Sequence, residues 1–482
     1  MKEGDIYMRI ILSNCIRIDE PTREVAEFVK KELTFKNTEY EKKKRMGFYT
    51  YGMSKDIKLY NDYNGSLYVP YGFFDKLYAF YPYKDSYVDY TTTNNINIDS
   101  NISLRDYQVP GLRAIKEHYN GLFVLPCGLG KTELALQCVY ELKQKAIWIT
   151  HTTDLVNQAK ERCDAKMKCK TSTITDGKID TSGDIVFCTM QTLYKMIEKN
   201  KVPQNMFGML IADECHRVAA NPSTIQMFRT CIDYFACRYK LGLTATLHRA
   251  DGLEKCITSI IGSVIYEVVK VKNDYVGMYE GKEILRFSVD KFQVPAHIKV
   301  IETNYDISDK EVFSANGGTI QFATLISDLG MNAERNKQIL KTLKTIQGST
   351  LVLSDRVEQL EYLCSKVDSG VCISGKTPKK QRTQALKDVA SGKIKFLFAS
   401  YSLAKEGLSV DILSNLVLAT PVKDFAIVQQ SIGRIQRLYE GKTVANVYDF
   451  VDNVGMLLRF YTKRRATYRK NGWIIDNMYL ND

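Results

Sequence analysis

The sequence contains no unbroken apolar run that approaches eighteen residues, which excludes an ordinary membrane-spanning helix. An apolar stretch at residues 6–16 is interrupted by polar side chains, and no small-residue cleavage site follows it, so no signal peptide is predicted. No Cys-x-x-Cys pair occurs among the 12 cysteines, and only 5 histidines are present, so no zinc site is predicted. We expect reduced thiols and a cytoplasmic protein.

The rest of the composition is that of a globular protein, with 45% hydrophobic and 25% charged residues. A length of 482 residues predicts about three domains. The net charge of +12 keeps nucleic acid among the candidate partners. Lysine and arginine outnumber aspartate and glutamate by 24 to 14 in residues 331–482, whereas residues 1–100 carry fifteen of each. The basic excess therefore belongs to the last third of the chain.

The order of strand-like and helix-like segments predicts the domains. Residues 1–98 are rich in aromatic side chains and turn signals, and we interpret them as a small α+β accessory domain, with residues 91–100 as a polar linker. Short apolar runs alternate with helical runs in residues 99–270, and again in 331–482. This alternation predicts two tandem α/β domains with parallel sheets. Residues 271–330 are interpreted as an irregular connection.

A phosphate-binding loop follows the predicted strand 122–125. The segment Pro126–Thr132 reads Pro-Cys-Gly-Leu-Gly-Lys-Thr and leads into a helix, which is the context such a loop requires. The glycines let backbone amides turn toward phosphate oxygens at the positive end of the helix. Lys131 is expected to reach the β- and γ-phosphates, and the Thr132 hydroxyl to bind Mg²⁺.

Two adjacent carboxylates end a later apolar strand, at Asp213 and Glu214. A carboxylate at the end of a buried strand beside a phosphate loop can hold Mg²⁺, and the next one can orient and deprotonate the attacking water. In the last third, Arg434 and Arg437 are three residues apart and so share one helix face, where their charge can offset that of the transferring phosphoryl group. ATP and Mg²⁺ are the expected cofactors.

Eight segments in this order resemble the motifs of the superfamily 2 DExH helicases, and the nearest group is XPB/UvsW-like, close to the T5-type phage branch-migration helicases. The segments are Leu104–Gln108, Pro126–Thr132, Thr150–Leu155, Thr189–Leu193, Asp213–His216, Leu243–Thr246, Ser400–Ser409 and Gln430–Arg437. The resemblance implies two RecA-like domains and an ATP-dependent helicase. The small N-terminal domain resembles the DNA-engaging accessory module of phage helicases, although residues 1–100 carry no net charge to hold a strand. Relatives commonly carry aspartate where this chain has Ser409, with Asp411 two residues further on.

The resemblance also implies roles for individual residues. Catalytic roles fall on Lys131, Asp213, Glu214, Arg434 and Arg437, with Mg²⁺ on Thr132 and Asp213. Nucleotide-binding roles fall on Arg105, Gln108, Cys127, Gly128, Leu129, Gly130, Lys131, Thr132, Glu133, Gly407 and Gln430. Coupling of hydrolysis to movement falls on His216, Thr244 and Thr246. Strand contacts are expected from Thr150, His151, Thr152, Thr189, Gln191 and Ser354, and from a basic cluster of Lys376, Lys379, Lys380 and Arg382.

The predicted function is ATP-driven unwinding of duplex or branched DNA, with 3′ to 5′ movement implied by the resemblance. A second basic cluster, Lys463–Lys470, is interleaved with tyrosines and is interpreted either as a strand-binding groove or as a solvated helix face. The alternatives are an RNA helicase, a restriction-system translocase and a non-catalytic nucleic-acid scaffold. DNA is the expected partner and a monomer the expected state. For a viral chain, the location is the host cytoplasm.

Overall fold

The computed structural model describes residues 8–126, 128–175, 178–217, 222–247, 254–271, 274–288, 292–305, 307, 321–406, 408, 410–422 and 425–478. The chain divides into two compact units, which are described separately below. The first unit is Met1–Val269 with Val276–Arg286, and the second is Lys270–Tyr275 with Phe287–Asp482.

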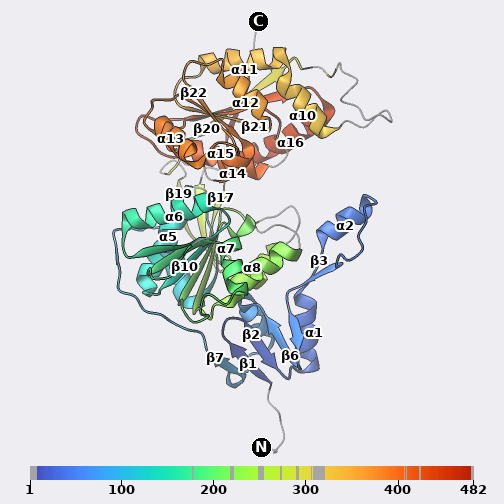
Figure 1. The fold of residues 1–482 in the computed structure, drawn as a ribbon, viewed down its shortest axis with the longest axis vertical. Coiled ribbons are helices and arrows are strands. Elements are labelled where there is room, and N and C mark those ends of the chain that lie inside the picture. Colours follow the sequence, from blue (N-terminus) through green and yellow to red (C-terminus); the bar gives the residue numbers. More distant parts are fainter. Residues whose placement is uncertain are drawn as a thin grey trace, which may run out of the picture. The chain divides into compact units, whose positions relative to one another are not determined.

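The first unit begins with a small α+β region whose five-stranded sheet has the order β5-β6-β2-β1-β7 (Figure 1). Its strands are β1 Arg9–Leu12, β2 Ile16–Asp19, β5 Asn61–Tyr63, β6 Ser66–Val69 and β7 Tyr87–Asp89. Its helices are α1 Arg23–Glu32, η1 Tyr71–Phe73, α3 Phe74–Phe80 and η2 Lys84–Ser86. An inserted hairpin consists of β3 Thr34–Lys36, α2 Thr38–Arg45 and β4 Asp56–Lys58.

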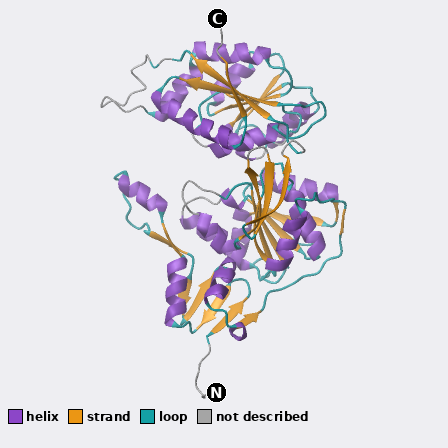
Figure 2. Ribbon diagram, turned by 180° about the vertical axis from the view of Figure 1, so that it is seen from behind, coloured by secondary structure: helices purple, strands orange, loops and turns teal. Residues whose placement is uncertain are grey.

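A ten-stranded sheet forms the larger part of the first unit, in the order β13-β12-β14-β10-β15-β16-β9-β17-β18-β19. Neighbouring strands are parallel from β12 to β17, as the alternating pattern predicted. The strands are β9 Asn120–Val124, β10 Ala146–Thr150, β12 Thr171–Thr175, β13 Lys178–Ile179, β14 Ile185–Thr189, β15 Met209–Asp213, β16 Tyr239–Thr244, β17 Val264–Val271, β18 Asp274–Tyr279 and β19 Lys282–Ser288. Figure 2 shows helices on both faces of this sheet. They are α4 Val109–His118, α5 Lys131–Leu142, α6 Thr153–Lys166, α7 Met190–Glu198, η3 Cys215–Arg217, α8 Pro222–Tyr234 and α9 Glu254–Ile261.

The polar segment 91–100 is attached along the large domain, which corrects its interpretation as a free linker. The side chain of Asn94 donates to the Met206 carbonyl at 2.7 Å, and its backbone N–H donates to Gln144 Oε1 at 2.8 Å. The short strand β8 (Asp99–Ser100) pairs with β11 (Met167–Lys168). Asparagine and threonine are common in linkers, but their side chains also satisfy backbone groups of an adjoining domain, and here they do so.

A continuous core joins the small region to the large domain. One cluster of buried apolar residues runs from Ile10 and Phe73 in the small region to Phe228 and Ile261 in the large one. Gly72 lies so close to α9 that an added Cβ would meet the Gly262 nitrogen at 2.4 Å. The two regions are therefore parts of one packed body, which the single-unit division also reflects.

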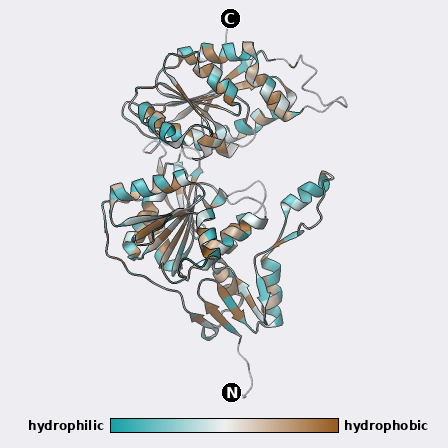
Figure 3. Cartoon of the chain, in the orientation of Figure 1, coloured by the Kyte–Doolittle hydropathy of each residue, from teal (hydrophilic) through white to brown (hydrophobic). Residues whose placement is uncertain are grey.

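The second unit contains a seven-stranded sheet in the order β22-β23-β21-β24-β25-β20-β26, with every neighbouring pair parallel. The strands are β20 Ala296–Thr303, β21 Thr350–Ser354, β22 Gly370–Ile373, β23 Phe396–Ser400, β24 Asn415–Leu418, β25 Ala445–Asp452 and β26 Ile474–Met478. The helices are α10 Phe322–Met331, α11 Ala333–Thr345, α12 Val357–Cys364, α13 Lys379–Ala390, α14 Tyr401–Glu406, α15 Phe425–Ile435 and α16 Gly455–Lys470. Figure 3 shows hydrophobic colours concentrated on the strands of both large sheets.

The interpretation of residues 271–330 as irregular was wrong for its described parts. This stretch contains β18, β19 and β20, and β20 lies inside the second sheet between β25 and β26. The partners of β20 come more than 140 residues later in the chain, from Ala445 and Ile474 onward. Such long-range pairing leaves no local signal in the sequence, because the neighbours that bury the strand are distant.

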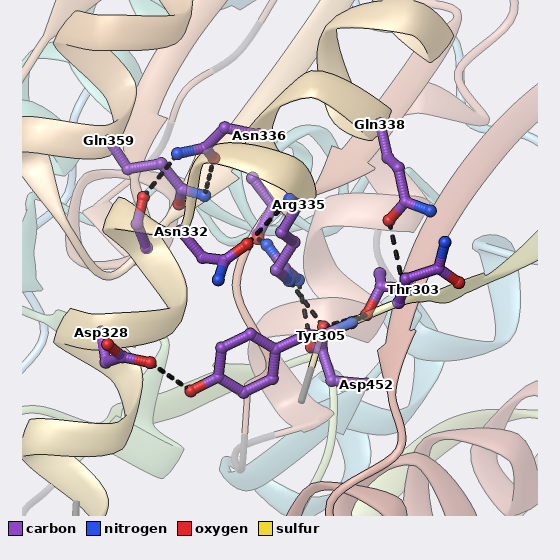
Figure 4. Close-up of polar contacts among 12 residues, drawn as sticks. Thr303, Tyr305, Asp328, Asn332, Arg335, Asn336, Gln338, Gln359 and Asp452 are labelled. Atoms are coloured by element: carbon purple, nitrogen blue, oxygen red, sulfur yellow. Dashed lines mark hydrogen bonds and ion pairs between the residues drawn. The ribbon is translucent and has the colours of Figure 1, made fainter. Parts of the chain in front are cut away.

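A buried ion pair fixes the centre of the second unit (Figure 4). Arg335 of α11 donates to both carboxylate oxygens of Asp452 at the end of β25, at 2.6 and 3.1 Å. Both side chains have 0% exposure. Thr303 donates to the same carboxylate at 2.5 Å, and Arg335 also donates to the Ala419 carbonyl at 2.5 Å. One arginine thus joins a helix to the ends of three strands.

Candidate functional site

The predicted motifs of the first unit meet at one edge of the large sheet. Thr189, Thr150, Asp213, Thr244 and Val124 end the adjacent strands β14, β10, β15, β16 and β9. Thr150 is paired with Thr189, and Thr244 with Val124. Carboxyl ends of parallel strands form the edge at which α/β sheets bind ligands. Segments up to 120 residues apart in sequence are thereby brought together.

The phosphate loop leaves this edge after β9. Gly128 and Gly130 have φ values of 87° and 71°, a left-handed conformation that glycine adopts without strain. At Gly130 a Cβ would also meet Gln108 Nε2 at 2.7 Å, so both the backbone conformation and the lack of space favour glycine there. Lys131 begins α5 and donates to the Leu125 carbonyl at 3.1 Å. The loop therefore joins β9 to α5 through two left-handed glycines, while Cys127 lies outside the described residues.

Gln108 supports the phosphate loop in this structure. Its amide donates to the carbonyls of Leu129 and Gly130 at 3.2 and 3.0 Å, and its oxygen accepts from the Arg105 backbone N–H at 2.9 Å. The residue is only 3% exposed. Arg105 in turn donates to the Tyr107 hydroxyl at 2.8 Å. Gln108, a predicted nucleotide-binding residue, is thus already engaged by the loop, and Tyr107 joins the site without having been predicted.

Asp213 and Glu214 form a half-buried acidic pair. Burial, followed by the charge of Glu214, raises the pKa of Asp213 to about 6, while the Lys131 ammonium opposes this rise. Asp213 also accepts from the Glu214 backbone N–H at 2.9 Å. Glu214 has a left-handed φ of 51°, which marks a constrained backbone at the strand end. A carboxylate whose pKa is raised by desolvation and by a neighbouring carboxylate fits a site that receives a cation.

A polar chain runs from Glu214 to the end of β16. His216 Nδ1 lies 3.2 Å from Glu214 Oε2 and 2.9 Å from the Thr244 hydroxyl. The Thr244 hydroxyl donates to the Thr246 carbonyl at 2.7 Å and accepts from the Thr246 backbone N–H at 3.2 Å. Because that hydroxyl gives its hydrogen to Thr246, we assign the hydrogen between His216 and Thr244 to His216 Nδ1. The predicted coupling residues are therefore in contact.

The oxygen donors of the site fit Mg²⁺. Thr132 lies at the start of α5, and Asp213 interacts electrostatically with the neighbouring Lys131. A hydroxyl and a carboxylate are hard oxygen ligands, and Mg²⁺ in phosphate-transfer sites takes few protein ligands besides phosphate and water. Within the described ranges, no group of three or more histidine, cysteine, aspartate or glutamate side chains is arranged for a metal.

Arg162 is a site residue that the sequence did not reveal. It belongs to α6, and its Nη1 donates to the Thr132 hydroxyl at 3.2 Å. An arginine on a helix carries no sequence signal for such a role, because the contact depends on how α6 packs beside α5. In the structure the hydroxyl expected to bind Mg²⁺ accepts a hydrogen bond from a cation.

The two motif arginines of the second unit lie on α15 and just after it. Arg434 donates to the Ala404 carbonyl, and Arg437 pairs with Asp411 at 2.9 Å. Asp411 is the carboxylate two residues beyond Ser409. Gln430 is half-buried on α15. Both Gly407 and Ser409 lie outside the described residues.

Two of the predicted strand contacts are corrected by their burial. Thr150 is 1% exposed and donates to the Thr152 carbonyl at 3.0 Å, and Ser354 is 0% exposed and donates to Gln359 Oε1 at 2.7 Å. Their hydroxyls therefore hold the backbone of their own loops and are not offered to a strand. Thr152 and Thr189 are N-caps of α6 and α7. His151 is half-buried and Gln191 is exposed beside them.

The basic clusters of the second unit differ in character. Lys376 and Lys380 are exposed, Arg382 is half-buried, and the side chain of Lys379 lies outside the described part of the chain. In the other cluster, Arg464 is 1% exposed and pairs with Asp449 at 2.8 Å, and the buried Tyr468 hydroxyl donates to the same carboxylate. The groove interpretation of Lys463–Lys470 is therefore wrong for Arg464 and Tyr468, which fix α16 to β25.

A phosphate loop, a half-buried Asp-Glu pair and two parallel-sheet units define a nucleoside triphosphatase with tandem RecA-like domains. A family model described as "Type III restriction enzyme, res subunit" matches residues 101–249, and one described as "Helicase conserved C-terminal domain" matches residues 332–439. "Probable helicase D10" of Escherichia phage T5 is 27% identical over 353 residues, which cover 72% of this chain and 71% of that protein.

Two further relatives extend these matches. "DNA 3'-5' translocase XPB2" of Sulfurisphaera tokodaii is 26% identical over 394 residues, covering 77% of this chain and 84% of that protein. The solved structure of Dbp5 from S. cerevisiae bound to RNA and ADP BeF3 covers 79% of this chain and 95% of that one, at 14% identity and a TM-score of 0.53. The last likeness concerns the fold alone.

The chain belongs to the superfamily 2 DExH helicases of the XPB/UvsW type and is a nucleic-acid-dependent ATPase. None of the helices in the described ranges is long and apolar enough to cross a membrane.

Proposed function

We propose that the chain is an ATP- and Mg²⁺-dependent DNA helicase or translocase that acts on duplex or branched DNA and moves 3′ to 5′. The observation that carries the proposal is the polar chain from Glu214 through His216 to Thr244, which starts beside Asp213 and the phosphate loop. The DNA substrate and the direction are supported by the printed name of the XPB2 relative. We place the activity in the cytoplasm, in keeping with the free thiols of the described cysteines.

The hydrolytic step follows from the chemistry of the first unit. Lys131 offers a cation to the β- and γ-phosphates, and the loop amides and the start of α5 add partial positive charge. Thr132 and Asp213 would hold Mg²⁺, which would supply positive charge to the phosphate oxygens. Glu214 takes a proton from the attacking water. Loss of the γ-phosphate then changes the charge that faces Glu214, and His216 and Thr244 transmit this change to the end of β16.

The second unit supplies the arginines. We propose that Arg437 exchanges its ion pair with Asp411 for the γ-phosphate when ATP is bound, since a dianionic phosphate attracts a guanidinium more strongly than an exposed carboxylate does. Arg434 lies three positions earlier, at the end of α15. Arginines of this kind contribute about 10³–10⁵ in rate. Strand contacts are proposed for His151, Thr152, Thr189 and Gln191, which lie at the carboxyl edge of the first sheet.

The proposal is tested by measuring ATP hydrolysis with single-stranded DNA, forked duplex, a four-way junction and RNA in parallel. Glu214→Gln should lower kcat by about 10²- to 10⁴-fold and leave ATP binding intact, because the amide cannot accept the proton. Glu161→Gln, an exposed glutamate of α6, is the matched control and should hydrolyse ATP like the parent chain.

Each outcome decides one part of the proposal. Stimulation by RNA that equals or exceeds stimulation by DNA contradicts the DNA assignment. Full hydrolysis by the Glu214→Gln variant contradicts the catalytic assignment. A strand-displacement assay with a duplex flanked by either a 3′ or a 5′ single strand decides the direction.

A further inference from the structure

The inserted hairpin of the small region, residues 34–58, is here named the N-terminal arm. Figures 1 and 2 both show α2 standing clear of the rest of the first unit, joined to it through β3. None of the predicted motifs lies in the arm, and the ATP site does not use it. Its construction and its surface nevertheless point to a ligand.

The arm is a defined structure. Strands β3 and β4 pair in antiparallel register from Thr34 with Lys58 to Lys36 with Asp56. Asn37, which is 0% exposed, caps α2 by accepting from two backbone N–H groups, and its own amide donates to the Ser54 carbonyl at 2.8 Å. Because a two-stranded hairpin is only marginally stable by itself, this buried asparagine stabilises the arm by joining both strands to the helix.

Large apolar side chains are exposed at the tip of the arm. Met46, Phe48, Tyr49 and Tyr51 are 58%, 59%, 81% and 85% exposed, within six consecutive positions. The two tyrosine rings are stacked, with their centroids 5.9 Å apart. Single exposed apolar residues are common, but a cluster of aromatic rings on a surface marks an interaction site. Exposed planar rings are the surfaces on which unpaired bases stack.

The arm is also positively charged within a region that is neutral as a whole. Residues 34–58 contain seven lysine and arginine residues against three aspartate and glutamate residues, a net of +4, whereas the rest of residues 1–100 carries eight against twelve, a net of −4. Two of these cations are paired with carboxylates, Lys36 with Asp56 and Lys43 with Glu39. Lys42, Lys44 and Arg45 are exposed on α2, beside the aromatic tip.

We propose that the N-terminal arm binds single-stranded DNA, with Phe48, Tyr49 and Tyr51 stacking on unpaired bases and the cations of α2 holding the adjacent phosphates. Single-stranded DNA is the ligand that fits both the exposed aromatic rings of the tip and the exposed cations of α2. Duplex DNA would be attracted by the cations alone, since its bases are already stacked, and a protein partner would not require the segregation of charge. The proposal rests on the proposed DNA-dependent function, because it adds a second strand-binding site to the same chain.

The test compares two matched double variants of the full chain. Tyr49→Ala with Tyr51→Ala removes two rings of the tip, and Tyr63→Ala with Tyr83→Ala removes two tyrosines of the same region, 66% and 64% exposed, that lie outside the arm. Binding is measured without nucleotide, by anisotropy, on a fluorescent oligothymidylate and on a blunt duplex. The tip variant should lose about tenfold or more in affinity for the single strand and little for the duplex.

Stacking is observed directly with 2-aminopurine placed in the oligothymidylate, whose fluorescence is quenched when it stacks on a ring. Quenching by the parent chain and by the control variant, but not by the tip variant, supports the proposal. Lys42→Gln, Lys44→Gln and Arg45→Gln together should lower the slope of log affinity against log salt by about 2 on the single strand.

Three results would overturn the proposal. These are equal single-strand affinities for the tip and control variants, equal losses on single strand and duplex, and an unchanged salt slope in the charge variant. If the tip variant and the control variant bind every nucleic acid equally well, the tip would be assigned to a protein partner instead. Because binding is measured without ATP, failure of the arm is distinguishable from failure of the proposed function, which appears as an ATPase that DNA does not stimulate.

Discussion

At the scale of single residues, several groups do more than the sequence motifs assign to them. Gln108 supports the carbonyls of the phosphate loop, and Arg162 donates to the hydroxyl of Thr132. Both contacts hold the resting site in a defined geometry before nucleotide arrives. Arg437 is likewise held by Asp411. The site residues are therefore held by contacts within the chain itself.

Lys442 anchors the segment around Arg437. Its ammonium donates to the carbonyls of Asp411 and Arg437, each at 2.9 Å. Burial is the main reason that the pKa of Lys442 falls from its ordinary value of 10.5 to about 8; the Arg437 charge lowers it further, and Asp411 opposes the fall. The half-buried Lys442 ammonium is thus destabilised by its desolvation.

Stability should therefore rise with pH through a window that Lys442 defines. Between about pH 8 and pH 10.5 the unfolded chain binds more protons at this position than the folded chain, so the contribution of Lys442 rises with pH and is lowest below that window. The measurement is urea unfolding of the parent and of Lys442→Met from about pH 7 to about pH 10. The parent should gain stability relative to the variant as pH rises. Parallel curves would refute the assignment.

At the scale of elements, buried ion pairs connect the helices of the second unit to its strands. Arg335 joins α11 to β25, and Arg464 joins α16 to the same strand through Asp449. Such pairs are not strongly stabilising compared with apolar residues, because both charges are desolvated. Their significance is geometric, since each guanidinium satisfies groups at strand ends that would otherwise be unpaired.

Removing one partner of the Arg335 pair should therefore be costly. Arg335→Met leaves Asp452 buried without its partner, and we expect a loss of about 3–5 kcal/mol in the free energy of unfolding of the second unit. The chain has 2 tryptophans, Trp148 in the first unit and Trp473 in the second, so a Trp148→Phe background reports unfolding of the second unit by fluorescence.

Lys337→Met is the control for this prediction. Lys337 is on the same helix, but its pair with Glu334 is 3.9 Å long and about four-fifths exposed on both sides. Exposed pairs contribute roughly 0–1 kcal/mol, so this variant should unfold like the parent. Equal effects of the two substitutions would show that burial of the ion pair has no special cost here.

At the scale of the whole molecule, the small N-terminal region and the first motor domain form one body. Their cores are continuous, and Lys240 of β16, itself 0% exposed, donates to the Asn14 carbonyl at 2.7 Å. Because β16 ends at Thr244, the strand that carries this coupling residue also contacts the small region. A DNA strand bound to the N-terminal arm would therefore be bound to the same body that binds ATP.

Gly72→Ala tests whether the two regions unfold together. The added methyl would approach the Gly262 nitrogen to 2.4 Å, and overpacking of this kind costs about 1–3 kcal/mol. In a Trp473→Phe background, the unfolding of the large domain reported by Trp148 should shift by this amount, although Gly72 lies in the small region. Gly375→Ala, with open space around its position, is the control. An unchanged Trp148 transition would show that the regions unfold independently.

Many features of the two motor domains were predictable from the sequence, because their strands and loops depend on residues that are close together in the chain. The strands that end at Asp213 and Thr244 are short apolar runs, and the loop at Gly130 requires glycines within a few residues of a lysine and a helix start. Such patterns reflect backbone conformation and burial, which adjacent residues determine. The α/β class, the two parallel sheets and the superfamily followed from them.

Only the tertiary structure decided which side chains face one another. Ser354 and Thr150 resemble surface contacts in sequence but are buried, Arg464 belongs to a core ion pair, and Arg162 reaches the phosphate loop. The sequence determined the motifs and their order; the fold decided their burial and partners. The physical reason is that a residue's neighbours in a parallel sheet come from distant segments, so exposure and pairing are properties of the packed molecule and not of the local pattern.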